Sequence, residues 1–296
     1  MIHTPVMVQE VLKQLALQQG DTVVDATAGT GGHTLEIAKQ VGKNGTVVAI
    51  ERDNEEIDVL CRRITKHNLQ HNVIVAGGNY ADMDVICQEE GVENVAGVLF
   101  DLGFSSWHIE ESGRGFSFTR NEPLDMRYEQ DDESGVSAYH IVNTYSREQL
   151  KNIFLKYGEE PKADIIAQAI TKERKKDIIK TTGDLVQIIT QIAKSRPGIN
   201  PATRSFQALR IAVNDELRCL EQGLESALSV VGSEGRIVVI SFHSLEDRVV
   251  KHTFKEWEDV GVGNILTKKV ITPHFSEKQN NRRARSAKMR VFSVEV

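Results

Sequence analysis

The sequence pattern most suggestive of chemistry is the glycine-rich stretch DATAGTGGH, which ends at His33 and directly follows a short apolar run. Gly29, Gly31 and Gly32 let a ligand approach the backbone closely, and a helix that starts there offers free N–H groups. A dinucleotide fingerprint requires glycine three residues after Gly31, but Thr34 stands there. The stretch therefore predicts a ligand other than a nicotinamide or flavin, with a ligand-free turn as the alternative.

Two carboxylates follow later apolar runs in the same way. Glu51 ends the run TVVAIE, where a carboxylate can accept both hydroxyls of an adenosine ribose. Asp101 ends the run GVLFD, a usual position for a catalytic group beside the reactive end of a ligand. Tyr80, which follows a third run, is placed to pack against adenine. Considered singly, each residue has a structural alternative: a solvated loop acid for Glu51, a helix or turn cap for Asp101 and a packing residue for Tyr80.

Three further stretches mix aromatic, polar and basic side chains, a combination that suits base stacking together with phosphate contact. They are RGFSF at 114–118, PLDMR at 123–127 and SFHSLEDR at 241–248. His243 in the third stretch follows another predicted strand, so it is either a pocket residue or a structural histidine. Near the end of the chain, residues 278–290 hold six basic residues and no acidic one, which predicts a basic tail.

The elements that must position these residues alternate between strands and helices. This order predicts an α/β fold: a doubly wound, mostly parallel sheet covered by helices on both faces, with ligands at the carboxyl edge of the strands. Apolar runs predict strands at 22–25, 46–50, 73–75 and 97–101, and helices at 6–15, 34–41 and 82–90.

The alternation stops after residue 103. Residues 104–136 predict a long ordered loop, and helix-start signals at Ser146 and Thr181 open an all-helical stretch. An apolar repeat from Phe206 to Val231 predicts a single helix of about 26 residues. We expect a discontinuous sheet domain, residues 1–112 and 207–296, interrupted by a helical substrate-recognition domain at 113–206. The second part of the sheet domain has predicted strands at 236–241, 269–272 and 289–294 and a helix at 245–257.

Composition narrows the class of protein. The chain has 296 residues, 40% of them hydrophobic and 26% charged, with a net charge of −6, which is typical of a globular protein. Its three cysteines, Cys61, Cys87 and Cys219, lie too far apart in sequence to suggest a disulfide framework or a four-cysteine zinc site. No apolar run approaches the roughly 18 residues of a membrane span, and the first residues lack a signal-peptide pattern. We expect a cytoplasmic protein.

Ten motifs, in the same order along nearly the whole chain, resemble the MraW family of ribosomal RNA small subunit methyltransferases. They are HTPV at 3–6, GGH at 31–33, DLGFSS at 101–106, RGFSF at 114–118, PLDMR at 123–127, YGEE at 157–160, PATR at 201–204, FQALR at 206–210, SFHSLEDR at 241–248 and NRRARSA at 281–287.

The resemblance implies a class I, Rossmann-like methyltransferase domain with a helical insertion. It also implies methyl transfer from S-adenosylmethionine to N4 of a specific cytidine in the decoding region of 16S rRNA. Glu51 stands where the family usually has Asp, and His108 stands where it usually has Gln. Together with the glycine turn, the resemblance implies a cofactor site formed by Gly29, Gly31, Gly32, His33, Glu51, Tyr80, Asp101 and His108.

Attack of cytosine N4 on a sulfonium methyl group needs no metal and no covalent intermediate, so alignment is the main task of the protein. Asp101, Ser105 and His243 are the candidate catalytic residues, the first two as acceptors of an N4 hydrogen. Carbon-5 methylation is disfavoured because it needs a thiolate, and all three cysteines lie in predicted helices. The candidate substrate contacts are the aromatic residues Phe104, Trp107 and Phe116, which would hold a flipped base, and Arg114, Arg127, Arg204, Arg248, Arg282, Arg283 and Arg285.

The expected partner is 16S rRNA within the small ribosomal subunit, and a homodimer remains open. Two other functions also remain open. One is a methyltransferase acting on DNA or on a small molecule, and the other is a cofactor-binding assembly factor without catalysis.

Overall fold

The computed structural model describes residues 5–129, 135–192 and 200–295. His3 and Thr4 of the first family motif lie outside these residues. The chain forms two compact units, one made of Met1–Gly103 with Leu217–Val296 and the other of Phe104–Glu216. The predicted inserted domain, 113–206, falls inside the second unit. No helix among the described residues is long and apolar enough to cross a membrane.

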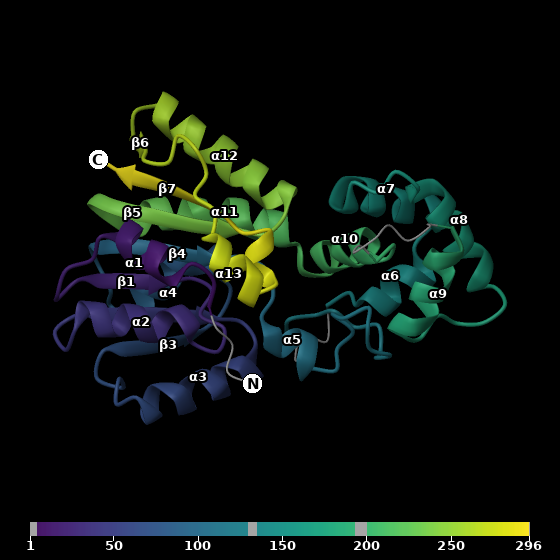
Figure 1. Ribbon diagram of the computed structural model, residues 1–296, viewed down its shortest axis with the longest axis horizontal. Coiled ribbons are helices and arrows are strands. Elements are labelled where there is room, and N and C mark those ends of the chain that lie inside the picture. Colours follow the sequence, from purple (N-terminus) through teal and green to yellow (C-terminus); the bar gives the residue numbers. More distant parts are fainter. Residues whose placement is uncertain (1–4, 130–134, 193–199, 296) are drawn as a thin grey trace. The chain divides into compact units, whose positions relative to one another are not determined.

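The first unit contains a seven-stranded sheet in the order β3-β2-β1-β4-β5-β7-β6 (Figure 1). The five strands from β3 to β5 are parallel, whereas β7 and β6 run antiparallel to their neighbours. This confirms the predicted mostly parallel, doubly wound fold. The strands are β1 (Thr22–Asp25), β2 (Thr46–Glu51), β3 (Val73–Gly77), β4 (Val95–Asp101), β5 (Val231–Ser241), β6 (Gly263–Ile265) and β7 (Lys288–Val294).

Both faces of the sheet are buried under helices, which explains why its strands are continuous apolar runs rather than alternating ones. Val23 and Val47 face a core shared with α1, α2 and α3, whereas Val24 and Val48 face a core shared with α4, α11 and α12. The helices of this unit are α1 (Val8–Leu15), α2 (Gly32–Val41), α3 (Asn54–Lys66), η1 (Tyr80–Asp82), α4 (Met83–Glu89), α11 (Glu216–Val230), α12 (Ser244–Asp259), α13 (Phe275–Asn280) and η2 (Arg283–Arg285).

The second unit is helical, as predicted, and has its own apolar core. Ser146 forms a reciprocal capping box with Gln149 at the start of α7. Thr181 and Asp184 exchange equivalent hydrogen bonds before α9, of 2.9 and 3.2 Å. Its helices are α5 (Ser106–Glu110), α6 (Ala138–Thr144), α7 (Arg147–Gly158), α8 (Ala163–Glu173), α9 (Thr182–Ile192) and α10 (Thr203–Asn214).

The single long helix predicted from residue 206 to 231 is wrong. Asp215 has φ +49°, a left-handed conformation that ends α10, and α11 begins at the next residue. The apolar repeat continues on both sides of this break, so its periodicity concealed the break.

Three other expectations need correction. The strand predicted at 269–272 is absent: Ile271 forms only an isolated bridge, and β6 is the edge strand. The predicted loop at 104–136 contains α5. The basic stretch 278–290 is not a tail, because it runs through α13, η2 and β7 and buries Ala284 and Ala287 in the core of the sheet unit.

Candidate active site

The carboxyl ends of β1, β2 and β4 bring three acids to one edge of the sheet. Asp25 at the end of β1 is fully buried and accepts a 2.7 Å hydrogen bond from the Thr34 hydroxyl of α2. Burial raises the pKa of Asp25, and nearby His33 opposes that rise. Asp25 therefore fixes the start of α2 against β1, a role that the sequence pattern alone did not assign.

The turn between β1 and α2 needs glycine for steric reasons. Gly29 and Gly31 have φ +51° and +87°, a region that L side chains rarely adopt. A Cβ at Gly31 would also lie 2.5 Å from the Leu60 Cδ1 atom of α3. The turn thus leaves backbone without side chains at the N-terminus of α2, where N–H groups are available to a ligand.

Glu51, at the end of β2, is tied to this turn. Its Oε2 atom accepts from the Gly29 N–H at 2.8 Å, and its Oε1 atom accepts from Arg52 and Asp53 at 2.8 and 2.9 Å. A carboxylate offers about four acceptor sites, so one on Oε2 remains for a ligand hydroxyl. Burial raises the pKa of Glu51 to about 7, against the lowering effect of the three backbone hydrogen bonds.

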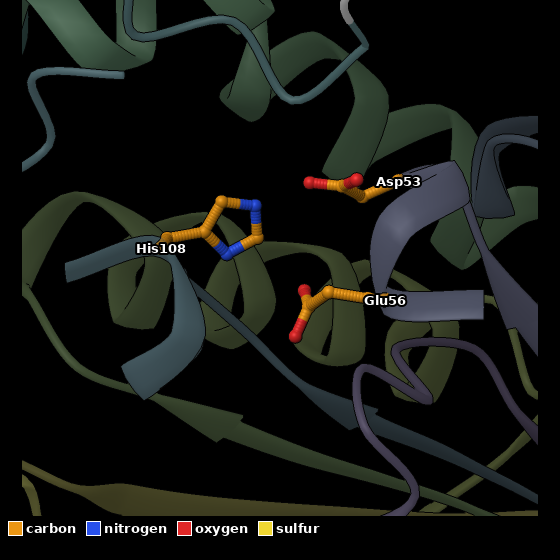
Figure 2. Close-up of side chains that lie close together, drawn as sticks. All are labelled: Asp53, Glu56 and His108. Carbon is orange, nitrogen blue, oxygen red and sulfur yellow. The ribbon is translucent and has the colours of Figure 1, made fainter. Parts of the chain in front are cut away.

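Two more acids stand at the start of α3, immediately after Glu51. Figure 2 shows the carboxylates of Asp53 and Glu56 projecting from this helix, and both residues are buried. Asp53 caps α3 by accepting from the Glu55 N–H at 3.0 Å. His108, also drawn in Figure 2, belongs to α5 of the inserted unit.

Asp101, at the end of β4, lies beside His33. The His33 Nε2 atom is 3.6 Å from Asp101 Oδ2, and both side chains are largely buried. Neither His33 Nε2 nor Asp101 Oδ1 has a hydrogen-bond partner among the described residues. Buried polar atoms are rarely left unpaired, so these two indicate a place that a ligand completes.

Burial controls the ionisation of this pair. It raises the pKa of Asp101 to about 6, although the charge of Arg283 lowers it and that of Glu246 raises it. Burial also lowers the pKa of His33, an effect opposed by Asp25 and reinforced by Arg283. At neutral pH the site therefore presents an ionised carboxylate next to a neutral imidazole.

Tyr80 follows β3 and His243 follows β5, the two outer strands of the parallel part of the sheet. Tyr80 packs edge-on against Phe100 at 5.5 Å, and a Cβ at Gly223 of α11 would lie 2.5 Å from its ring. His243 caps α12: its Nδ1 atom accepts from the Glu246 N–H at 3.3 Å, and its Nε2 atom lies 3.1 Å from Glu246 Oε1. Despite this proximity, His243 Nε2 has no hydrogen-bond partner among the described residues.

The inserted unit gathers several predicted substrate residues into one aromatic cluster. The Phe116 ring lies between those of Phe104 and Tyr128, with centroids 6.1 and 5.4 Å away, and His108 packs against it at 4.8 Å. Ser105 caps α5 and places its hydroxyl 3.0 Å from His108 Nδ1. Tyr128, which directly follows the PLDMR motif, was not anticipated.

Two arginine side chains, those of Arg114 and Arg210, pack against rings of this aromatic cluster. Arg114 is buried, lies 5.1 Å from the Trp107 ring centroid and donates to the Tyr128 carbonyl at 2.8 Å. Arg210 lies 4.5 Å from the Phe104 ring and binds Glu216 through two hydrogen bonds of 2.7 and 2.9 Å. Arg210 and Glu216 were missed because a continuous helix would have placed them on different faces.

The remaining predicted arginines are spread over both units. Arg127 pairs with Asp125 at 2.8 Å, and exposed Arg204 donates to the Glu159 carbonyl at 3.0 Å, both within the inserted unit. In the sheet unit, the Arg283 guanidinium lies 5.6 Å from the Phe242 ring centroid. Arg248, Arg282 and Arg285 are exposed.

Comparison with known proteins places these features in a family. A model of the MraW methylase family matches residues 1–295. The ribosomal RNA small subunit methyltransferase H of Dictyoglomus thermophilum is 45% identical over 291 residues, covering 98% of this chain and 96% of that protein. Its counterpart from Coprothermobacter proteolyticus is 42% identical over 294 residues, covering 99% and 96%. This chain therefore belongs to the MraW methylase family, as the sequence motifs predicted.

Proposed function

We propose that this protein transfers a methyl group from S-adenosylmethionine to N4 of a specific cytidine in the decoding region of 16S rRNA. The observation in the structure that carries the proposal is the unpartnered pair, Asp101 Oδ1 and His33 Nε2, buried beside the glycine turn. Full-length relatives named as ribosomal RNA small subunit methyltransferase H support the substrate class. The cytidine, its N4 atom and the decoding region rest on the family resemblance.

The residues at the sheet edge fit S-adenosylmethionine. The Gly29–Gly31 turn leaves room at the backbone, Glu51 retains an acceptor site for a ribose hydroxyl, and Tyr80 offers an aromatic face for adenine. When bound, the donor supplies an electrophilic methyl group on its sulfonium. We assign its binding to Gly29, Gly31, Gly32, His33, Glu51, Tyr80, Asp101 and His108.

Asp101 is the strongest candidate for acting on the nucleophile. The lone pair of cytosine N4 is delocalised into the ring, and accepting a hydrogen bond from the amino group favours the pyramidal, attacking form. The Oδ1 atom of Asp101 has no hydrogen-bond partner among the described residues and is available for that bond, whereas the hydroxyl of Ser105 faces His108. His243 Nε2 also lacks a hydrogen-bond partner there, but it lies 3.1 Å from the Glu246 carboxylate. Ser105 and His243 remain predictions as catalytic residues.

We propose that residues 113–206 form the substrate-recognition domain. Phe104 and Trp107 are half-buried and offer ring surface to a flipped base, whereas Phe116 is 7% exposed and stacks on Phe104. Arg114 is buried against Trp107, so it orients that ring. We expect the more accessible arginines, namely Arg127, Arg204, Arg248, Arg282, Arg283 and Arg285, to contact phosphates, which makes binding weaken as salt increases.

It follows from this proposal that the protein acts in the cytoplasm and that its substrate is the small ribosomal subunit. A homodimer is a further proposal, and light scattering of the purified protein tests it.

Methyl transfer assays separate the proposal from its alternatives. Tritiated S-adenosylmethionine is incubated with purified protein and, in parallel, with small subunits, naked 16S rRNA or DNA. We expect label in small-subunit RNA, and none with Asp101→Ala. Label in DNA would support a DNA methyltransferase, and donor binding without label in any substrate would support a non-catalytic assembly factor.

A further inference from the structure

One segment of the sheet unit has a charge opposite to that of the whole chain. Residues 266–290 contain eight Lys or Arg residues and one acidic residue, Glu277, although the net charge of the chain is −6. The Glu277 carboxylate accepts a 2.8 Å hydrogen bond from the backbone N–H of Met7, the residue before α1. The only acid of the segment is therefore used to anchor it.

The segment holds a defined shape. Ala284 and Ala287 are buried in the core that α1 and α2 share with the sheet. The Arg285 Nε atom donates to the Lys278 carbonyl at 3.2 Å, which fixes that guanidinium at the end of α13. These contacts hold the backbone, from which Arg282 and Arg285 are exposed, whereas Lys288 and Arg290 bind Asp247 at 2.9 and 2.8 Å.

Phe275 opens α13 and is 70% exposed, more than any other aromatic residue among the described large hydrophobic residues. Lys278 follows one helical turn later, on the same side of α13. The chain neighbours of Phe275, His274 and Ser276, are exposed and polar, so no apolar side chain is next to it in the sequence. An isolated exposed ring among cations does not resemble the centre of a protein–protein interface, which is surrounded by apolar residues.

We propose that Phe275 is a stacking platform for an unpaired RNA base, with Lys278, Arg282 and Arg285 on the flanking phosphates. We call this surface, which runs from α13 (labelled in Figure 1) through Arg282 to η2, the Phe275 platform. Every base offers a π-face, and cations beside an aromatic ring track the phosphate backbone, so this combination suits single-stranded RNA. The inference rests on the proposed RNA methylation and adds a base-stacking site to the phosphate contacts proposed for Arg282 and Arg285.

Binding of a labelled single-stranded RNA of about 12 nucleotides, followed by fluorescence anisotropy, tests the platform. We expect Phe275→Ala to weaken binding about tenfold and Phe275→Trp to preserve it, since stacking survives in the second variant. Binding to a duplex of the same sequence should not change with Phe275→Ala. Val260→Ala is the matched control, because Val260 is 73% exposed in the same unit and is followed by no basic cluster.

The charge component has its own measurement. Removing one cation that binds a phosphate should make the plot of log affinity against log salt shallower by about 0.7 for a single strand. We expect that change for Arg282→Gln and for Arg285→Gln, and none for Phe275→Ala.

Methylation assays distinguish failure of this inference from failure of the proposed function. If wild type methylates small subunits, we expect Phe275→Ala to raise KM and leave kcat and donor affinity unchanged. Unchanged RNA binding by Phe275→Ala in an active enzyme would overturn the platform alone. A change of oligomeric state in Phe275→Ala would also overturn it, because the ring would then cover a second copy of the chain. Absence of methylation by wild type, with RNA binding still dependent on Phe275, would contradict the proposed function instead.

Discussion

Asp101→Asn removes the charge at the centre of the candidate site while preserving the size of the side chain. Asp101 lies at the buried end of β4, faces His33, and feels the charges of Arg283 and Glu246. Burial raises its pKa from 3.8 to about 6. We expect this substitution to slow methyl transfer, because an amide oxygen is a weaker acceptor than a carboxylate, and, unusually for a change at a buried polar residue, to stabilise the unliganded protein.

The magnitude follows from the pKa shift. A raised pKa means that the folded state holds the proton more tightly than the unfolded state, so stability is complete below about pH 4 and is lost as pH rises through about 6. A shift of about two pKa units corresponds to about 3 kcal/mol. Asparagine does not ionise, so we expect the variant to be more stable by up to about 3 kcal/mol at about pH 8 and by about half of that near pH 5.

Urea unfolding of wild type and Asp101→Asn, at several pH values between about 5 and 8, measures this difference directly. Asp58→Asn serves as the control, because Asp58 is an exposed acid on α3 and its substitution should leave the difference near zero at every pH. Equal or lower stability of Asp101→Asn at about pH 8 would refute the reasoning, as would a stability difference that does not change with pH.

Three further predictions address the turn, the ribose acid and the inserted unit. Affinity for S-adenosylhomocysteine, measured by calorimetry, should fall about tenfold from about pH 8 to about pH 6 in wild type, because protonation of Glu51 removes an acceptor, and Glu51→Gln should flatten that profile. Gly31→Ala should lower the free energy of unfolding by about 2 kcal/mol, because it combines φ +87° with a clash at Leu60. Arg210→Gln should destabilise the inserted unit by about 3 kcal/mol in denaturant unfolding, since it leaves the largely buried Glu216 carboxylate without its ion-pair partner and, among the described residues, with the Tyr128 hydroxyl alone.

Each of these has a matched control. Gly91 has φ +66°, but a Cβ added to it would meet nothing within 4 Å, so Gly91→Ala isolates the backbone strain from the clash. Arg147→Gln removes an exposed ion pair with Asp164 and should cause no measurable loss. A pH-dependent affinity that persists in Glu51→Gln would assign the titration to another group. Similar losses in Gly31→Ala and Gly91→Ala, or in Arg210→Gln and Arg147→Gln, would contradict the packing argument.

Local sequence patterns predicted most of the sheet and the residues at its edge. The strands predicted from the apolar runs at Asp25, Glu51 and Asp101 agree with the observed strands to within two residues at each boundary. Strands that are buried on both faces need a continuous apolar sequence, which makes them easy to recognise. The glycine turn was also predictable, because its backbone conformation and its close packing both require glycine. Gly31 meets a backbone conformation and a packing limit that no other residue satisfies.

The missed features depend on interactions that leave weak local signals. The break at Asp215 requires a left-handed residue that is not glycine, and the apolar repeat continues through it. The strand β6 has only three residues and pairs with β7. Neither sequence contains a pattern that identifies the other as its partner, so the sequence did not predict this pairing. Residues 104–136 are rich in glycine, serine, proline and charge, which predicts a loop, and the cap at the start of α5 uses His108 where a capping box usually has Glu or Gln.

Mass spectrometry of nucleosides from 16S rRNA tests the central claim most directly. The RNA is isolated from a bacterium that lacks its own family member and carries either this protein or its Asp101→Ala variant. We predict that wild type restores N4-methylcytidine and that the variant, although it is produced at a similar level, does not. RNA without N4-methylcytidine in cells that contain folded wild-type protein would contradict the account.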